Sequence, residues 1–334
     1  MELSEEIEAT AAERGALASA AEALAATRMV RVMTYNILAG GWRTVDALAE
    51  VMLDARPDLI GMQEVAPGTL AKLADRLEMH AALSPSRYGA PVALLSRWPL
   101  LDVNRHPGAP LRNALLEAVV APEGSAPLRV FVTHLSAYFS RWRGGEGERL
   151  RELAFVLEQM HPTAHEAQLL MGDFNSMAPG ERLLASQLLL HTARNDERRA
   201  KGEDMSGHPS LPRLLPAPIR PLASVAAALM RVAPLAWLAD QVAGAYVPRA
   251  VVGAALAAGY RDLYAEAHPD PRQRAMSYSS SIAAGRIDYI FASPALAAGL
   301  LTCEALGETP TRPVSRASDH LPLLATIAAP AAQG

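Results

Sequence analysis

Short β-type runs and longer helical runs alternate along this chain from Met29 onward. The β-type runs are rich in Val, Ile and Leu and are bounded by turn-forming residues, which is typical of buried strands. Neighbouring runs such as 115–120 and 128–134 resemble hairpins, whereas other runs are separated by helices. This mixed order favours two packed sheets with helices outside over one purely parallel sheet. Strands are predicted at 30–36, 58–63, 92–96, 115–120, 128–134, 168–173, 287–292 and 321–327, and helices at 45–54, 69–77 and 147–160.

The region from about 180 to 258 departs from this pattern and is predicted to be a helical insertion. Five prolines between His208 and Pro221 prevent regular structure, and residues 222–243 are then strongly apolar. A membrane span fits poorly, because a central arginine such as Arg231 costs about 2.5–3.5 kcal/mol in hydrocarbon. Two interpretations stay open: a helical cap packed on the sheets, or a lid that covers the substrate or makes peripheral membrane contact.

Residues 1–28 are predicted to form an N-terminal helical extension to a main domain at 29–334, unless the natural chain begins at Met29. This segment has no basic start and no compact apolar core, so a secretory signal is not expected and a cytoplasmic location is predicted. The single cysteine, Cys303, excludes a disulfide within the chain. No feature indicates an obligate protein partner.

Polar side chains follow several predicted strands, at the point where each strand ends. Asp173 and Asn175, for example, come directly after the apolar run 168–171. A buried polar group without a hydrogen-bond partner costs about 2–7 kcal/mol, so these groups need partners or a use. If the strand ends converge at one rim of the sandwich, they form a single pocket. Its predicted members are Asn36, Glu64, His134, Asp173, Asn175, Asp288, Asp319 and His320.

This set of side chains has a limited range of chemical uses. Carboxylate and amide oxygens without a cysteine cluster suit Mg²⁺ or Mn²⁺ better than Zn²⁺. Imidazoles and an amide beside such a cation can bind phosphoryl oxygens, and a free carboxylate can position and deprotonate water. The pattern therefore predicts hydrolysis of a phosphate ester.

Seven short segments then carry a family resemblance. In this order they resemble the motif set of the endonuclease/exonuclease/phosphatase superfamily, which implies a four-layer α/β sandwich with a catalytic domain over 29–334. The resemblance spans residues 30 to 327 apart from the insertion. The segments are TYNI at 34–37, QE at 63–64, SRWPL at 96–100, THL at 133–135, GDFN at 172–175, RIDYIF at 286–291 and SDHLP at 318–322.

The resemblance implies a metal site built on Glu64 as the principal ligand, with Asn36 and with Asp319 as an acid near the metal. The expected cofactor is Mg²⁺ or Mn²⁺. Many DNA-repair relatives carry an acid two residues after the first asparagine, whereas this chain has Leu38. A site with one metal is therefore expected.

The resemblance also implies catalytic roles. Asp173 corresponds to the residue that orients and activates the water, and Asn175 to its phosphate-binding neighbour. His134 matches the residue that binds the scissile phosphate. Asp288 matches the acid that holds His320, and His320 matches the histidine that stabilises charge on phosphorus in the transition state.

Arg112 and Tyr138 are further candidates for substrate binding. Tyr138 belongs to a basic and aromatic segment, 136–147, that could stack on a base or insert into a lipid interface. The six remaining histidines considered are assigned to the surface or to packing: His80, His106, His161, His165, His208 and His268.

The leading hypothesis is a metal-dependent phosphodiesterase whose substrate is a lipid, another small diester or a nucleic acid. The net charge of −4 provides no global basic field for DNA or RNA. Three alternatives stay open: a nuclease, a phosphomonoesterase such as one acting on an inositol phosphate, and a binding module without catalysis.

Overall fold

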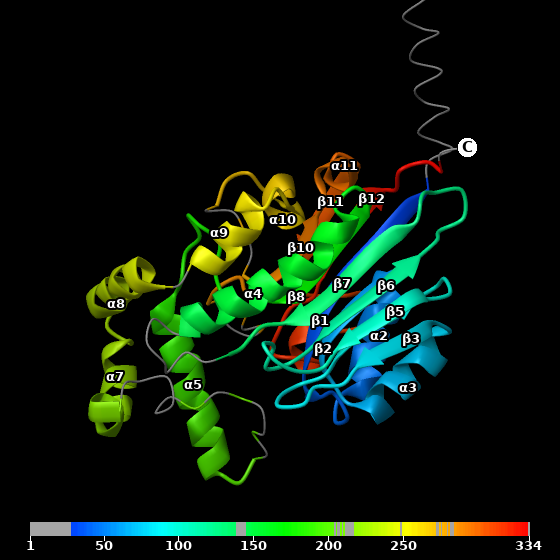
Figure 1. The fold of residues 1–334 in the computed structure, drawn as a ribbon. Coiled ribbons are helices and arrows are strands. Elements are labelled where there is room, and N and C mark those ends of the chain that lie inside the picture. The colour runs from blue at the N-terminus through cyan, green and yellow to red at the C-terminus, as the bar shows by residue number, and fades with distance from the viewer. Residues whose placement is uncertain are drawn as a thin grey trace, which may run out of the picture.

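The computed structural model describes residues 28–137, 145–203, 205, 208, 210, 217–247, 249–271, 274, 276–278, 280 and 284–332. Two six-stranded sheets form the centre of this structure (Figure 1). The first sheet, in the spatial order β11-β12-β1-β2-β4-β3, contains β1 (Met29–Gly40), β2 (Leu59–Val65), β3 (His80–Ser84), β4 (Val92–Ser96), β11 (Leu300–Ala305) and β12 (Leu323–Ala328). The second, in the order β5-β6-β7-β8-β10-β9, contains β5 (Leu101–His106), β6 (Leu115–Val120), β7 (Leu128–His134), β8 (Ala167–Asp173), β9 (Arg261–Asp262) and β10 (Asp288–Ala292).

Both sheets are mixed, as the order of elements in the sequence predicted. β1 pairs with β2 in parallel, β7 pairs with β8 in parallel, and the other pairs are antiparallel. Alternate side chains of β1 enter different cores, because successive residues of a strand point to opposite faces. Val30 and Val32 pack between the sheets, whereas Met33 and Tyr35 pack under the outer helices.

Helices cover the outer face of each sheet and complete a four-layer α/β sandwich. α2 (Val45–Ala55) and α3 (Pro67–Leu77) lie on the first sheet, and α4 (Glu146–Met160) and α9 (Ala250–Ala257) lie on the second. The predicted fold class is confirmed. The shorter helices are α10 (Leu263–Ala267), α11 (Pro294–Ala297) and the 3-10 turns η2 (His161–Thr163), η3 (Ala217–Leu222) and η4 (Val314–Arg316).

The two sheets approach closely at Gly61 of β2. A Cβ atom added at Gly61 would lie 2.3 Å from Sδ of Met171 on β8 and 3.2 Å from a methyl group of Val132 on β7. Since real Cβ atoms do not approach so closely, glycine is what allows these strands to pack at this distance.

The insertion contributes α5 (Ala185–Ala200), α7 (Ala223–Leu229) and α8 (Ala233–Tyr246), and α7 and α8 lie at the left edge of Figure 1. α7 and α8 make their main helix contacts with α5. The interpretation of this part as a cap packed on the sheets is therefore wrong for α7 and α8, because their support is another helix of the insertion. Residues 1–27 of the predicted N-terminal helix lie outside the part of the chain that the structure describes.

Candidate active site

The predicted strand ends meet at one rim of the sandwich. His134 is the last residue of β7 and Asp173 the last of β8, and the two are register partners in the parallel pair. Asp288, the first residue of β10, pairs with Asp173 in the antiparallel direction. Asn36 of β1 reaches the same place from the first sheet, since its side chain contacts Asp173.

The buried carboxylate of Asp173 is the centre of this group. Its Oδ1 accepts a hydrogen bond from the backbone N–H of Asn175 at 2.8 Å. Its Oδ2 accepts one from Nδ2 of Asn36 at 3.0 Å, and lies 3.6 Å from Nε2 of His134 and 3.8 Å from Nε2 of His320. One oxygen thus shapes the local turn, while the other faces an amide and two imidazoles.

The backbone around Asp173 has an unusual conformation. Gly172 has a φ of +153°, and a Cβ atom there would lie 1.9 Å from the carbonyl oxygen of Thr133. Asn175 has a φ of +47°, which asparagine tolerates better than most residues, and its Nδ2 donates to the carbonyl oxygen of Leu135 at 2.9 Å. These features hold the loops after β7 and β8 together.

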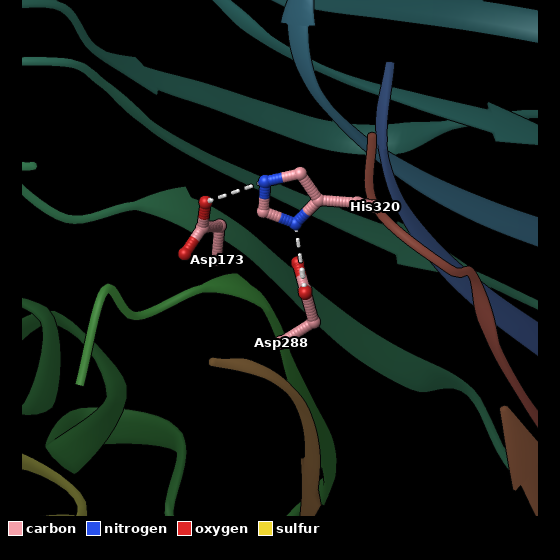
Figure 2. A group of neighbouring side chains, drawn as sticks. All are labelled: Asp173, Asp288 and His320. Carbon is pink, nitrogen blue, oxygen red and sulfur yellow. Dashed lines mark hydrogen bonds and ion pairs between the residues drawn. The ribbon is translucent and has the colours of Figure 1, made fainter. Parts of the chain in front are cut away.

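Asp288 orients the ring of His320. Oδ2 of Asp288 lies 2.9 Å from Nδ1 of His320, so the other ring nitrogen, Nε2, faces Asp173 (Figure 2). The hydroxyl of Ser277 accepts the backbone N–H of Asp288 at 3.2 Å, and the ring of Tyr278 lies 4.8 Å from that of His320. Ser277 and Tyr278 were missed in the sequence, because the stretch around them carries no strand or helix pattern.

Burial and neighbouring charges change the acid–base behaviour of the group. Burial, together with the nearby Asp288 carboxylate, raises the pKa of Asp173 to about 6, even though His320 and His134 oppose the change. Burial would lower the pKa of His320, but Asp288, Asp173 and Asp319 outweigh it and raise that pKa to about 10. At pH 7 Asp173 is therefore mainly a carboxylate beside a cationic imidazole.

Glu64 is held at the same rim by the strained end of β1. Its own φ is +60°, and the φ of Ala39 is +47°. Oε2 of Glu64 accepts the backbone N–H of Ala39 at 2.8 Å, and Oε1 lies 3.3 Å from Nδ2 of Asn36. The amide oxygen of Asn36 accepts the backbone N–H of Leu38 at 3.1 Å. These bonds leave lone pairs of the carboxylate available to a cation.

Asp319 faces the insertion. Its buried Oδ1 has no hydrogen-bond partner among the described residues, and Oδ2 lies 3.6 Å from Nδ1 of His208. His208 and His320 outweigh burial and hold the pKa of Asp319 below its ordinary value. His208 was assigned to the surface or to packing, whereas its ring lies beside this acid. No motif marks His208 in the sequence, because its contact joins residues that lie far apart along the chain.

Oxygen donors of the kind that bind hard divalent cations are present among the predicted ligands. Glu64, Asn36 and Asp319 offer oxygen atoms, and the unpartnered Oδ1 of Asp319 is a buried acceptor that a cation would satisfy. A second set, Asp173, Asp288 and His320, has ligand atoms within 4.8 Å of one another. Nδ1 of His320 and Oδ2 of Asp288 bind each other, whereas Nε2 of His320 faces Asp173 and the buried Oδ1 of Asp288 has no hydrogen-bond partner among the described residues.

Two buried ionic side chains of α4 hydrogen-bond to the loops that follow β7 and β8. The guanidinium of Arg149 donates to the hydroxyl of Ser176 and to the carbonyl oxygen of Ser136, each at 2.9 Å. Glu152 accepts the backbone N–H groups of Ser136 at 2.8 Å and of Arg112 at 2.9 Å. Burial lowers the pKa of Arg149 to about 10, so it remains a cation at neutral pH.

The exposed side chain of Arg112 lies in a neighbouring pocket of about 280 Å³. Tyr88, Ser136 and Arg151 also line this pocket, and Ser136 follows His134 by two residues. Arg112 is thus part of an adjoining pocket and not of the buried group around Asp173. Tyr138 lies outside the described residues.

A four-layer α/β sandwich with buried acids, amides and imidazoles at one rim defines the class of metal-dependent phosphoesterases. Within this class, the chain belongs to the Endonuclease/Exonuclease/phosphatase family, whose model matches residues 33–320. No curated protein matches the sequence.

Solved structures share the fold at low sequence identity. An AP endonuclease from Archaeoglobus fulgidus is 17% identical, with a TM-score of 0.57, and the match covers 89% of this chain and 99% of that chain. An endonuclease/exonuclease/phosphatase from Beutenbergia cavernae is 19% identical, with a TM-score of 0.55 and coverage of 91% and 72%. A 3′ phosphatase from Neisseria, bound to a product DNA hairpin, is 19% identical, with a TM-score of 0.54 and coverage of 89% and 99%.

Proposed function

We propose that this protein is a divalent-metal-dependent phosphodiesterase in which Asp173 activates the attacking water. The observation that carries the proposal is the environment of Asp173 Oδ2, which faces Nε2 of both His134 and His320. A pKa raised to about 6 keeps this carboxylate basic enough to accept a proton near neutral pH and mostly ionised at pH 7.

The other side chains have roles that follow from their contacts. His320, held by Asp288, donates from Nε2 toward a phosphoryl oxygen and stabilises the negative charge of the transition state. His134 donates to the scissile phosphate from Nε2. Asn175 uses one Nδ2 proton on Leu135, and its second proton is available to the phosphate.

Glu64, Asn36 and Asp319 would hold the cation, Mg²⁺ or Mn²⁺. A bound divalent cation polarises a phosphoryl oxygen and neutralises developing charge. The negative charges of the acids in the site offset its positive charges, so little positive charge remains to bind a phosphate monoester with two negative charges. A diester, which has one negative charge, is favoured. We propose a lipid or another small diester as the substrate.

A nuclease is the second candidate, and an exposed cation–π pair of a tryptophan and an arginine favours it. The guanidinium of Arg43 lies 4.4 Å from the ring of Trp42, which is largely exposed and follows the end of β1 that holds Glu64. Such rings stack on bases in proteins that bind single strands. Two of the similar structures, the AP endonuclease and the 3′ phosphatase bound to DNA, point the same way.

The test measures hydrolysis of bis(p-nitrophenyl) phosphate with Mg²⁺ or Mn²⁺, beside p-nitrophenyl phosphate, plasmid DNA and phospholipid vesicles. Asp173→Asn removes the base but keeps the shape, so turnover of the diester should fall by about 10²–10⁴. Asp75→Asn, which changes an exposed acid on α3, is the matched control. A rate near wild type for Asp173→Asn would remove Asp173 from the proposed role, and the order of rates on the four substrates decides between the candidates.

A further inference from the structure

The helices α7 and α8 leave most of their large apolar side chains exposed to solvent. α8 has no buried residue along its length, and Trp237 and Tyr246 on it are 64% and 82% exposed. Monomeric proteins rarely leave a contiguous apolar surface of this kind without a partner. The exposed large apolar residues of this segment are Leu222, Val225, Leu229, Val232, Leu235, Trp237, Leu238, Val242 and Tyr246.

These side chains follow helical spacing. Leu222, Val225 and Leu229 recur at three and four residues, and Leu235, Leu238, Val242 and Tyr246 do so on α8. Such stripes normally mark the helix face that packs on a core. Here both stripes are exposed, so their spacing fits a surface that becomes covered by something outside the fold.

The charges of the insertion differ in sign from those of the whole chain. Between residues 205 and 258 there are four arginines and one aspartate, whereas the net charge of the chain is −4. Arg231 is exposed at the break between α7 and α8. The one acid, Asp240, is half-buried and its carboxylate accepts the backbone N–H and the hydroxyl of Ser186 on α5 at 2.7 and 3.0 Å. The acid therefore faces α5, and the exposed surface of the helix pair carries a cation.

The shape of the pair fits an interface rather than a span. In the described part of the chain, no single helix is long and apolar enough to cross a membrane. α7 and α8 pass that test only together, and they are bent by 113° at their break, where Pro234 lies in the first turn of α8. A bent apolar pair with a basic residue at the bend is suited to lie at the boundary between headgroups and acyl chains.

We propose that α7 and α8 form a membrane-docking surface, here named the docking pair (residues 222–246), that binds bilayers containing anionic lipids. The apolar stripes enter the bilayer interface, and the exposed Arg231 at the bend lies near the negative headgroups. The proposal stands on the exposed surface and its charge, and it holds whichever phosphate ester the enzyme hydrolyses.

The test is flotation of the full chain with vesicles of phosphatidylcholine alone and of phosphatidylcholine with 30% phosphatidylglycerol. The variant Leu235→Ser/Leu238→Ser/Val242→Ser changes three exposed side chains of α8. Leu53→Ser/Leu256→Ser/Leu301→Ser changes three comparably exposed leucines elsewhere and is the matched control. We expect the α8 variant to lose at least ten-fold in binding to the anionic vesicles and the control to bind like wild type, with unchanged hydrolysis of a soluble diester by both.

Charge reversal gives an independent readout. Arg231→Glu should weaken binding to the anionic vesicles and leave the weaker binding to neutral vesicles unchanged, whereas Arg231→Lys should bind like wild type. Failure of the wild-type protein to float with anionic vesicles, or equal flotation of the α8 variant, would overturn the proposal. A third result would also overturn it: wild-type protein that is a dimer in light scattering, an α8 variant that is a monomer, and no binding of either protein to vesicles. The surface would then join two copies of the chain.

Discussion

A single buried carboxylate, Asp288, determines which nitrogen of His320 is presented to the reacting groups. Because Oδ2 of Asp288 binds Nδ1, the remaining N–H of the ring points at Asp173. The Asp288 carboxylate also raises the pKa of Asp173 and the pKa of His320. The buried group therefore contains a basic carboxylate beside a cationic imidazole. Asp288 acts through His320 in this arrangement, and it is a positioning residue.

Replacing Asp288 by asparagine tests this arrangement. We expect Asp288→Asn to lower kcat by about 10²–10⁴, because the amide no longer stabilises the imidazolium or holds its orientation. Mn²⁺ affinity, measured by calorimetry, should stay near the wild-type value, whereas Glu64→Ala should weaken it. Equal losses of Mn²⁺ affinity in both variants would instead make Asp288 a ligand.

At the scale of elements, the strongly apolar strands and helices could be predicted and the polar ones could not. α2, α3 and α4 lie within two residues of their predicted bounds, because each buries an apolar face. β5 and α5 were missed, since β5 is a largely exposed edge strand and α5 carries mostly polar residues. The motif order predicted which strand ends meet, while the contact between His208 and Asp319 depends on the insertion and has no local pattern.

The contact between the sheets at Gly61 gives a prediction about elements. Gly61→Ala should destabilise the protein by about 1–3 kcal/mol, because its Cβ would overlap Met171 and Val132 in a packed core. Urea unfolding followed by circular dichroism measures this change. Gly68→Ala, in α3 with open space around the new Cβ, is the control and should be neutral or slightly stabilising. Equal effects of the two substitutions would contradict the close approach of β2 and β8.

At the scale of the whole molecule, a buried ion cluster joins the insertion to the second sheet. Arg286, just before β10, donates to Glu181 at 2.9 Å and to Asp262 at 3.0 Å, and all three side chains are buried. Glu181 lies where the insertion begins, and Asp262 is the N-cap of α10. Glu181 also pairs with Arg274 at 3.2 Å, so Asp262 is the carboxylate that depends most on Arg286 for its neutralisation.

Removing this guanidinium should therefore have a large effect on folding. We expect Arg286→Met to lower the free energy of unfolding by about 3–5 kcal/mol, since Asp262 would be left buried without its cation and Glu181 would keep only Arg274 among the described cations. Arg76→Met breaks the exposed ion pair with Asp46 and should cost less than about 1 kcal/mol. Thermal and urea unfolding of both variants test the difference. A small loss for Arg286→Met would mean that water or rearrangement compensates the two acids.

The sandwich is tightly packed, whereas the docking pair is exposed. This difference predicts that backbone amides of the two parts exchange hydrogen at different rates. Amides of α7 and α8 should exchange much faster than those of β1 and β8, because the opening of an element with few buried side chains costs little free energy. Deuterium uptake measured by mass spectrometry checks this for peptides from 222–246 and from the strands. On anionic vesicles the uptake of residues 222–246 should fall while that of the strands stays constant. Slow exchange of α7 and α8 in free protein, at every protein concentration tested, would mean that these helices are already covered and have no surface left for a membrane.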